Sequence, residues 1–390
     1  MPTAEQKPRA LVTPEVLVWA RQEAGLDPEA AARKLGVKAE RLVQWEAGQE
    51  RPTILQLLSL SRMYKRNPAV FYLPGPPAEA LAVRDFRRLP DLQPAPLSPQ
   101  LRYEIRLAHT RRQVLLEVLG VNAPETRLFG VPTLEADPEE AGTRIRQHLG
   151  VTLQDQKTWR NADRAFKNWR EALERTGILV FQTNRVDVQE MRGFSIAEAR
   201  LPVILLNGGD APSGKCFSAL HELCHLILRN GGLCLPGQDR TGTYEDHEVL
   251  CNRVAGAALV PAESLLAEEA VRTIRRREDW TNEDLLALAR SYSVSREVIL
   301  RRLLILGRTT ERFYREKRQQ FLAERQAQEE QGHGGYAPPH AVTLNRVGRL
   351  YARSVLEGFH EGRVSASDLS RYLGLKLQHL PDFEASVYST

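Results

Sequence analysis

The chain has only four cysteines in 390 residues, too few for a disulfide framework. This scarcity is typical of a protein that works in a reducing cytosol. No run of about eighteen apolar residues occurs, so we expect no transmembrane helix. Residues 1–9 are polar and lack the apolar core of a secretory signal peptide. We therefore expect a cytoplasmic protein with no membrane partner.

Hydrophobic residues make up 42% of the chain and charged residues 26%, as in ordinary globular proteins. The length is sufficient for roughly two or three hydrophobic cores. A formal net charge of +5 is compatible with nucleic-acid binding but does not establish it.

Residues 221–225 read His-Glu-Leu-Cys-His inside an apolar run that favours a helix. Residues four apart lie on one helical face, so His221 and His225 can reach the same metal ion. Glu222 follows the first histidine, where it can hold and deprotonate a water bound to that ion. A strand-like run at 201–207 and a Gly/Asp/Pro/Ser turn precede the helix. This order is typical of zinc hydrolases, and we expect a Zn²⁺ site here.

A catalytic zinc needs a third protein ligand. Residues 244–261 predict a second helix, on which Glu248 shares the small, apolar side with Cys251. Helical phase and the usual His₂Glu ligand set favour Glu248, and His247 on a neighbouring face is the alternative. Asn252 is either a polar surface residue or a hydrogen-bond partner of a ligand.

These residues resemble the ImmA/IrrE family of zinc metallopeptidases, in the motif at 221–225 and in the later pattern Glu248-x-x-Cys251-Asn252. The likeness covers about residues 150–270 and includes strand-like runs at 177–181, 192–195 and 202–207. It implies that His221, His225 and Glu248 bind the metal and that Glu222 is the general base. Members of the family are thought to cut repressor-like proteins.

Short helices are predicted near the N-terminus at about 14–23, 29–35, 38–46 and 53–64, from their caps and glycine stops. A glycine turn joins the second to the third, as in a helix-turn-helix. The pattern Ala31-x-x-x-Leu35-Gly36-Val37 followed by Trp45-Glu46-x-Gly48 resembles the XRE/Cro repressor family. That resemblance implies operator DNA as partner and a homodimer. The residues expected to face bases or phosphates are Lys38, Ala39, Glu40, Arg41 and Gln44. A domain that binds protein instead of DNA is the alternative.

The predicted fold class is mainly α with a small β-sheet. We expect a helix-turn-helix domain at 1–77, a proline-rich connector with helices at 78–150, a zincin-like metallopeptidase domain at 151–270, a helical extension at 271–325, a linker at 326–341 and a small helical cap at 342–390. A basic face in the extension (Arg296, Arg301, Arg302, Arg308) is either a solvated surface over the core or a second DNA contact.

The leading hypothesis is a cytosolic DNA-binding regulator with a zinc peptidase domain that cuts a regulatory protein. The first alternative is an antitoxin or autorepressor that neutralises a cognate toxin by contact, with a non-catalytic zinc domain. A third is a stress-response regulator triggered by oxidation, for which Cys216, Cys224, Cys234 and Cys251 would have to be reactive. Tyr244 is a candidate for stabilising the oxyanion.

Overall fold

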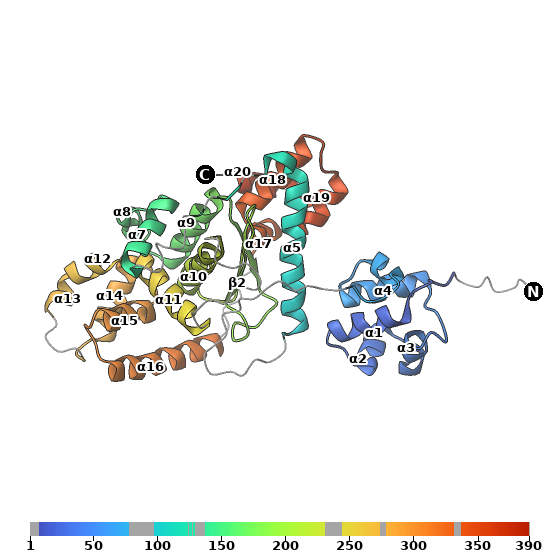
Figure 1. The fold of residues 1–390 in the computed structure, drawn as a ribbon, viewed down its shortest axis with the longest axis horizontal. Helices are drawn as coiled ribbons and strands as arrows, with labels where there is room; N and C mark the ends of the chain where they lie inside the picture. The colour runs from blue at the N-terminus through green and yellow to red at the C-terminus, as the bar shows by residue number, and fades with distance from the viewer. Residues whose placement is uncertain are drawn as a thin grey trace, which may run out of the picture. The chain divides into compact units, whose positions relative to one another are not determined.

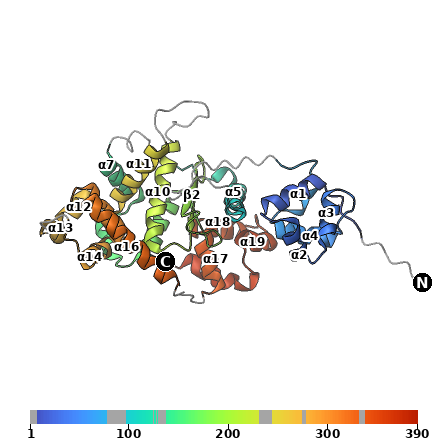
Figure 2. The same cartoon turned by 90° about the horizontal axis from the view of Figure 1, so that it is seen from below.

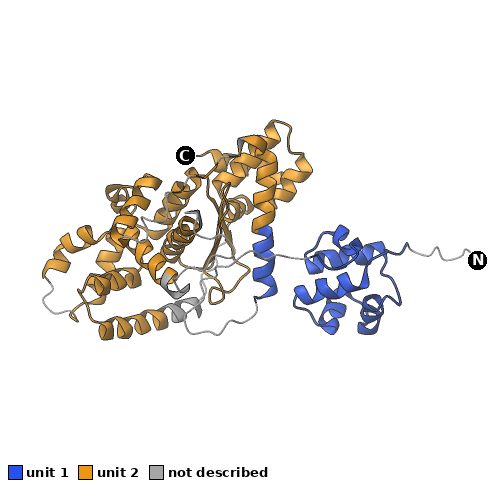
Figure 3. Ribbon diagram, viewed as in Figure 1, with its two compact units in different colours: residues 1–82, 92–107 blue, residues 83–91, 108–390 orange. Residues whose placement is uncertain are grey.

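The computed structural model describes residues 8–77, 97–123, 125–126, 128, 137–230, 244–273, 278–330 and 337–389. Within these ranges the chain is mainly α with one small β-sheet, which confirms the predicted fold class. Two compact units are present, residues 1–82 with 92–107 and residues 83–91 with 108–390 (Figure 3). The first part of the predicted connector, residues 78–96, lies outside the described residues. No helix in the described ranges combines the length and hydrophobicity that a membrane crossing requires.

The first unit is a bundle of short helices (Figure 1). They are α1 (Pro14–Glu23), α2 (Pro28–Leu35), α3 (Ala39–Glu46), α4 (Ile54–Tyr64), the 3₁₀ helix η1 (Pro68–Tyr72) and the start of α5 (Pro99–Leu119). The Asp27 carboxylate accepts from the Ala30 N–H at the start of α2, and Gly36 ends that helix with φ +72°. The four predicted helices are confirmed to within a few residues.

The core of this unit forms around Leu42 and Trp45 of α3, which are fully buried. Leu57 and Leu60 of α4 also belong to this core, but Ile54 does not and is 38% exposed. Ile54 is the first residue of α4 and directly follows the N-cap Thr53, and its side chain is not on the face of the helix that packs on the core. Tyr64 and Phe71 complete the core and have tilted rings 6.4 Å apart.

The second unit holds the rest of the chain. Its helices before the sheet are the end of α5, η2 (Gly120–Asn122), α7 (Pro138–Leu149), α8 (Leu153–Thr158) and α9 (Ala162–Arg175). After the sheet come α10 (Pro212–Asn230), α11 (Tyr244–Leu259), α12 (Ala262–Ala267), α13 (Glu269–Thr273), α14 (Asn282–Tyr292), α15 (Arg296–Ile305) and α16 (Glu311–Glu330). The C-terminal helices are α17 (Pro339–Val347), α18 (Arg349–His360), α19 (Ala366–Leu373), η3 (Leu377–His379) and α20 (Leu380–Tyr388).

Three strands form the sheet: β1 (Leu179–Thr183), β2 (Gly193–Ile196) and β3 (Val203–Asn207), in the order β1-β3-β2. β1 runs parallel to β3 and β2 runs antiparallel to it. All three are buried along their length, as expected for a sheet covered by helices. α9 and α10 pack on the sheet, and α11 lies beside α10 (Figure 2). The sheet therefore positions α10, which carries the His-Glu-Leu-Cys-His motif.

The C-terminal helices pack directly on the same sheet. The Phe181 ring of β1 meets Tyr351 of α18 edge to face at 5.6 Å, and α17 contacts β1. Glu174 of α9 accepts from the N–H groups of Arg349 and Leu350 at the start of α18. The segment predicted as a separate cap is thus built into the second unit.

The prediction of a linker starting at residue 326 is wrong for its first residues, because α16 continues to Glu330. Residues 326–330 read Gln-Ala-Gln-Glu-Glu, and the high helix propensity of these residue types outweighs the polar composition that suggested a flexible chain. Arg302, assigned to a basic face, is 1% exposed and belongs to the interior of the second unit.

Candidate metal centre

Helix α10 brings two histidines together at its buried face. Leu220, Leu223 and Leu226 are fully buried and hold the helix against the core. His221 and His225 lie one turn apart, with their Nε2 atoms 3.0 Å from each other. Glu222 is 1% exposed and lies on the same helix. The helical spacing predicted from the sequence therefore brings the two imidazole Nε2 atoms together.

Glu248 of α11 completes the cluster. Its Oε2 lies 3.3 Å from His221 Nε2, and its Oε1 lies 3.0 Å from His225 Nε2. Among the described residues, His221, His225 and Glu248 form the group of ligand atoms that could hold a metal ion, all within 4.8 Å of one another. His247 is not in this cluster. The geometry favours Glu248 as the third ligand, as helical phase predicts.

The spacing of the three donors fits zinc. Tetrahedral zinc with bonds of about 2.0–2.1 Å places neighbouring ligand atoms about 3.3 Å apart. The two Nε2 atoms are 3.0 Å apart, and each lies 3.0–3.3 Å from a different oxygen of the Glu248 carboxylate, which is close to the spacing of such a site. Two imidazole nitrogens and a carboxylate are also the donor set that zinc takes in hydrolases.

The charges within the cluster are complementary. Burial alone would raise the pKa of Glu248, but hydrogen bonds and charge from His221 and His225 hold it well below its usual range. Burial would lower the pKa of His225, yet hydrogen bonds with Cys251 and Glu248 raise it well above its usual value. The partly buried Glu248 carboxylate is therefore stabilised by the two imidazoles that face it.

Three further residues shape the site; sequence reasoning missed Phe217 and Gly193 and named Cys251 without placing it beside a histidine. Cys251 Sγ lies 3.8 Å from His225 Nδ1 and fixes that ring from the side opposite the cluster. The Phe217 ring stacks on His221 with centroids 6.3 Å apart. A Cβ on Gly193 of β2 would lie 3.3 Å from Glu222 Oε1, so the absence of a side chain lets β2 approach Glu222. Phe217 lies four residues before His221, and this helical spacing could have indicated it, but no sequence signal points to Gly193.

Other predicted participants have no support at the site. Asn252 is half-buried, and its Oδ1 has no hydrogen-bond partner among the described residues. Cys216, Cys224 and Cys251 are free, buried thiols, and burial raises the pKa of Cys216 and Cys251. Cys234 and the Tyr244 side chain lie outside the described residues.

Helices α2 and α3 of the first unit form the helix-turn-helix, with Gly36 and Val37 between them. Lys38, Glu40 and Arg41 are exposed, whereas Ala39 and Gln44 are partly buried and Ala39 packs on the core. Three of the five predicted DNA-facing residues are therefore exposed, and the other two are partly buried.

An ion pair, not expected from the sequence, holds α3 in place. Arg21 of α1 binds Glu46 through two hydrogen bonds, Nε to Oε1 at 2.8 Å and Nη2 to Oε2 at 3.0 Å. Such a bidentate contact fixes the orientation of α3 on α1.

Residues 17–71 match the helix-turn-helix family, and residues 173–304 match the IrrE N-terminal-like domain family. The chain therefore joins an XRE-type helix-turn-helix domain to an IrrE-like domain, which confirms the predicted fusion. The metal cluster and the whole sheet fall inside the second match. Together the two domains support a DNA-binding regulator.

A Mycobacterium tuberculosis transcriptional regulator of known structure is similar over 50% of this chain and 51% of its own, with 16% identity and a TM-score of 0.29. The chain thus spans about half the length of that protein. No curated protein matches the chain.

Proposed function

We propose that this chain is a DNA-binding regulator whose IrrE-like domain is a zinc-dependent endopeptidase acting on a regulatory protein. The observation that carries the proposal is the convergence of His221, His225 and Glu248, with Glu222 next to the first histidine on the same helix. Sites of this composition and spacing hydrolyse peptide bonds.

His221, His225 and Glu248 would hold the zinc ion. When bound, zinc polarises a carbonyl group and lowers the pKa of water toward neutrality. The Glu222 carboxylate would take a proton from the attacking water and deliver it to the leaving amine. Burial of Glu222 excludes bulk water, and Gly193 leaves space for its carboxylate against β2. Cys251 and Phe217 would keep the two imidazoles in position.

The helix-turn-helix supports operator DNA as the partner of the first unit. Lys38 and Arg41 are exposed on or beside α3 and would contact phosphates or bases. Because helix-turn-helix domains usually bind two half-sites of an operator, the protein would bind DNA as a homodimer.

The test is Glu222→Gln, which removes the base and keeps the size of the side chain. Cells that lack the native protein would express the wild type, Glu222→Gln or His221→Ala, and new protein N-termini would be mapped by mass spectrometry. We expect a set of N-termini with the wild type only, while purified Glu222→Gln keeps its zinc. Identical N-termini with Glu222→Gln would remove this residue from the base role.

The control for this experiment is Glu263→Gln, at an exposed glutamate in α12 outside the cluster. It should give the wild-type set of N-termini. If neither the wild type nor the control produces any N-termini while regulation persists through both His221→Ala and Glu222→Gln, the chain acts by binding and the peptidase proposal is wrong.

A further inference from the structure

A cavity lies in the same unit as the metal cluster but shares no residue with it. Its volume is about 620 Å³, within the usual range for small-molecule sites. The turn before α9, the segment leading into α10 and helices α14, α15 and α16 all contribute to its wall.

Four arginines line this cavity: Arg160, Arg192, Arg290 and Arg296. Only Arg296 has an ion pair there, with Glu324 at 2.6 Å. Within the described residues no ion pair is formed by the other three, and Arg192 Nε is buried without a hydrogen-bond partner. A buried guanidinium nitrogen with no acceptor is costly, so an incoming acceptor would be bound favourably.

The wall also holds two acidic residues, Asp210 and Glu297, against the four arginines. Asp210 Oδ1 accepts from the Ala211 N–H at the start of α10, 2.9 Å away. Glu297 lies 3.5 Å from each of Arg301 and Arg318, neither of which lines the cavity. Four arginines against two carboxylates leave the wall with a surplus of positive charge.

Ser293 provides a second, independent observation. It is 4% exposed, lines the cavity and has an Oγ with no hydrogen-bond partner in the described part of the chain. Its φ is +53°, and that of Arg160 is +59°. Left-handed backbone is unfavourable for residues other than glycine and collects at functional sites. Of the four such non-glycine residues among those described, two line this one cavity.

Part of the wall is apolar. Leu286 and Leu322 are among the exposed large hydrophobic residues, and Phe321 stacks with Arg296 at 4.3 Å. A ligand with both an anionic group and an apolar or aromatic part would cover the two kinds of surface together.

We propose that this cavity binds a phosphate-bearing small molecule of about nucleotide size. Three unpaired arginines favour a group with more than one negative charge, and guanidinium forks match phosphate oxygens. The buried Ser293 hydroxyl is within reach only of a ligand that enters the cavity, which favours a small molecule over a polymer backbone lying across the rim.

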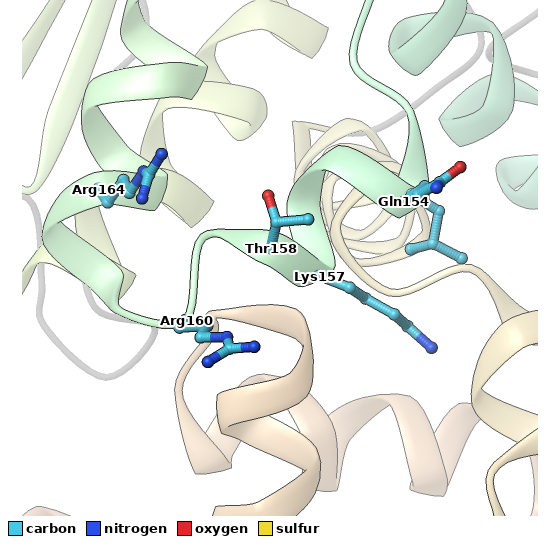
Figure 4. Close-up of a pocket in the computed structure, with 6 residues that line it drawn as sticks. Gln154, Lys157, Thr158, Arg160 and Arg164 are labelled. Carbon is cyan, nitrogen blue, oxygen red and sulfur yellow. The ribbon is translucent and has the colours of Figure 1, made fainter.

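A neighbouring depression does not carry the same inference. It is lined by Leu153, Gln154, Lys157, Thr158, Arg160 and Arg164 (Figure 4). Lys157 is already engaged there, with its Nζ 2.8 Å from Glu268 and 4.9 Å from the centre of the Tyr292 ring. Arg164 nevertheless offers a matched control, because it is an exposed arginine close to the cavity but outside its wall.

The test is calorimetric titration of the full chain with pyrophosphate, ATP and citrate. We expect ATP to bind more tightly than pyrophosphate, because its base can cover the apolar wall, and citrate to bind most weakly. Arg192→Gln should weaken ATP binding about tenfold or more, since it removes a charge-assisted contact. Arg160→Gly and Ser293→Gly remove the side chains while suiting the left-handed backbone, so they should weaken binding without loss of folding.

Arg164→Gln should bind ATP like the wild type. The proposal is overturned if neither phosphate probe binds at millimolar concentration, or if Arg164→Gln weakens binding as much as Arg160→Gly. Citrate binding as tightly as pyrophosphate would contradict the preference for phosphate. The titration needs neither metal nor cleavage, so its failure is distinguishable from failure of the proposed peptidase function.

Discussion

Arg302 of α15 and Glu139 of α7 form an ion pair within the second unit. Arg302 Nη2 lies 2.6 Å from Glu139 Oε1, and Arg302 Nε donates to the Val260 carbonyl oxygen at 2.9 Å. Glu139 Oε2 accepts from the Ala262 N–H at 3.0 Å. One buried arginine thus ties α7, the end of α11 and the start of α12 together.

We predict that Arg302→Met destabilises the second unit by about 2–3 kcal/mol. Breaking a buried pair leaves the other charge without its partner, and the partial exposure of Glu139 moderates the cost. Chemical denaturation followed by tryptophan fluorescence measures the effect. Arg315→Gln, which loses an exposed contact with Glu311 in α16, should change the free energy of unfolding by less than about 0.5 kcal/mol. Equal losses in both variants would show that the Arg302 contacts do not matter.

Gly142 sets the distance between α7 and α11. A Cβ at this position would lie 2.6 Å from the Ala258 backbone nitrogen and 2.8 Å from the Ala257 carbonyl carbon. We predict that Gly142→Ala costs about 1–3 kcal/mol, because backbone atoms cannot move aside as a flexible side chain can. Since α11 carries Glu248, zinc affinity measured by competition with a chelator should also fall. Thr143→Ala, one residue on and exposed, is the control and should leave both unchanged. A stable Gly142→Ala with normal zinc affinity would refute this account of the packing.

Local features of the sequence predicted much of this molecule. Proline starts, Asx and Thr caps and glycine stops place α1 to α4 because these signals act within a few residues. The cluster of His221, His225 and Glu248 was predictable because its histidines are one helical turn apart and Glu248 lies on the face of its helix that the apolar pattern turns inward.

Long-range contacts were beyond sequence reasoning. Nothing local indicates that Arg302 lies next to Glu139, that β2 passes Glu222 at Gly193, or that α18 covers β1. Each depends on how distant segments meet in space. The basic character of α15 was visible, but only the packing shows that Arg302 is buried.

If the first unit binds DNA, then Lys38→Ala and Arg41→Ala should each weaken binding. Each should also make the dependence of the logarithm of the binding constant on the logarithm of salt concentration less steep, by about one phosphate contact's worth. Both side chains are exposed at the α3 surface. Glu40→Gln should strengthen binding, because an exposed negative charge is removed from the same surface. Fluorescence anisotropy at several salt concentrations measures all three. Binding without salt dependence, or no DNA binding at all, would favour the protein-binding alternative for this domain.

The buried thiols make direct oxidation of the metal site unfavourable. Burial raises the pKa of Cys216 and Cys251, so little thiolate is present to react. We predict that a Cys234→Ser variant, which retains the three buried thiols, resists thiol reagents when native and labels three times when denatured. Fast labelling of the native variant would revive the hypothesis of an oxidation-triggered regulator.

The most direct test of the account is the zinc content of the purified chain. The chain is dialysed against buffer that contains zinc, the excess metal is removed, and the bound metal is measured by inductively coupled plasma mass spectrometry. The account predicts about one zinc ion per chain in the wild type and in His247→Gln, and a large loss in Glu248→Ala and His221→Ala. Full zinc retention by Glu248→Ala, or a wild-type chain that takes up no zinc, would contradict it.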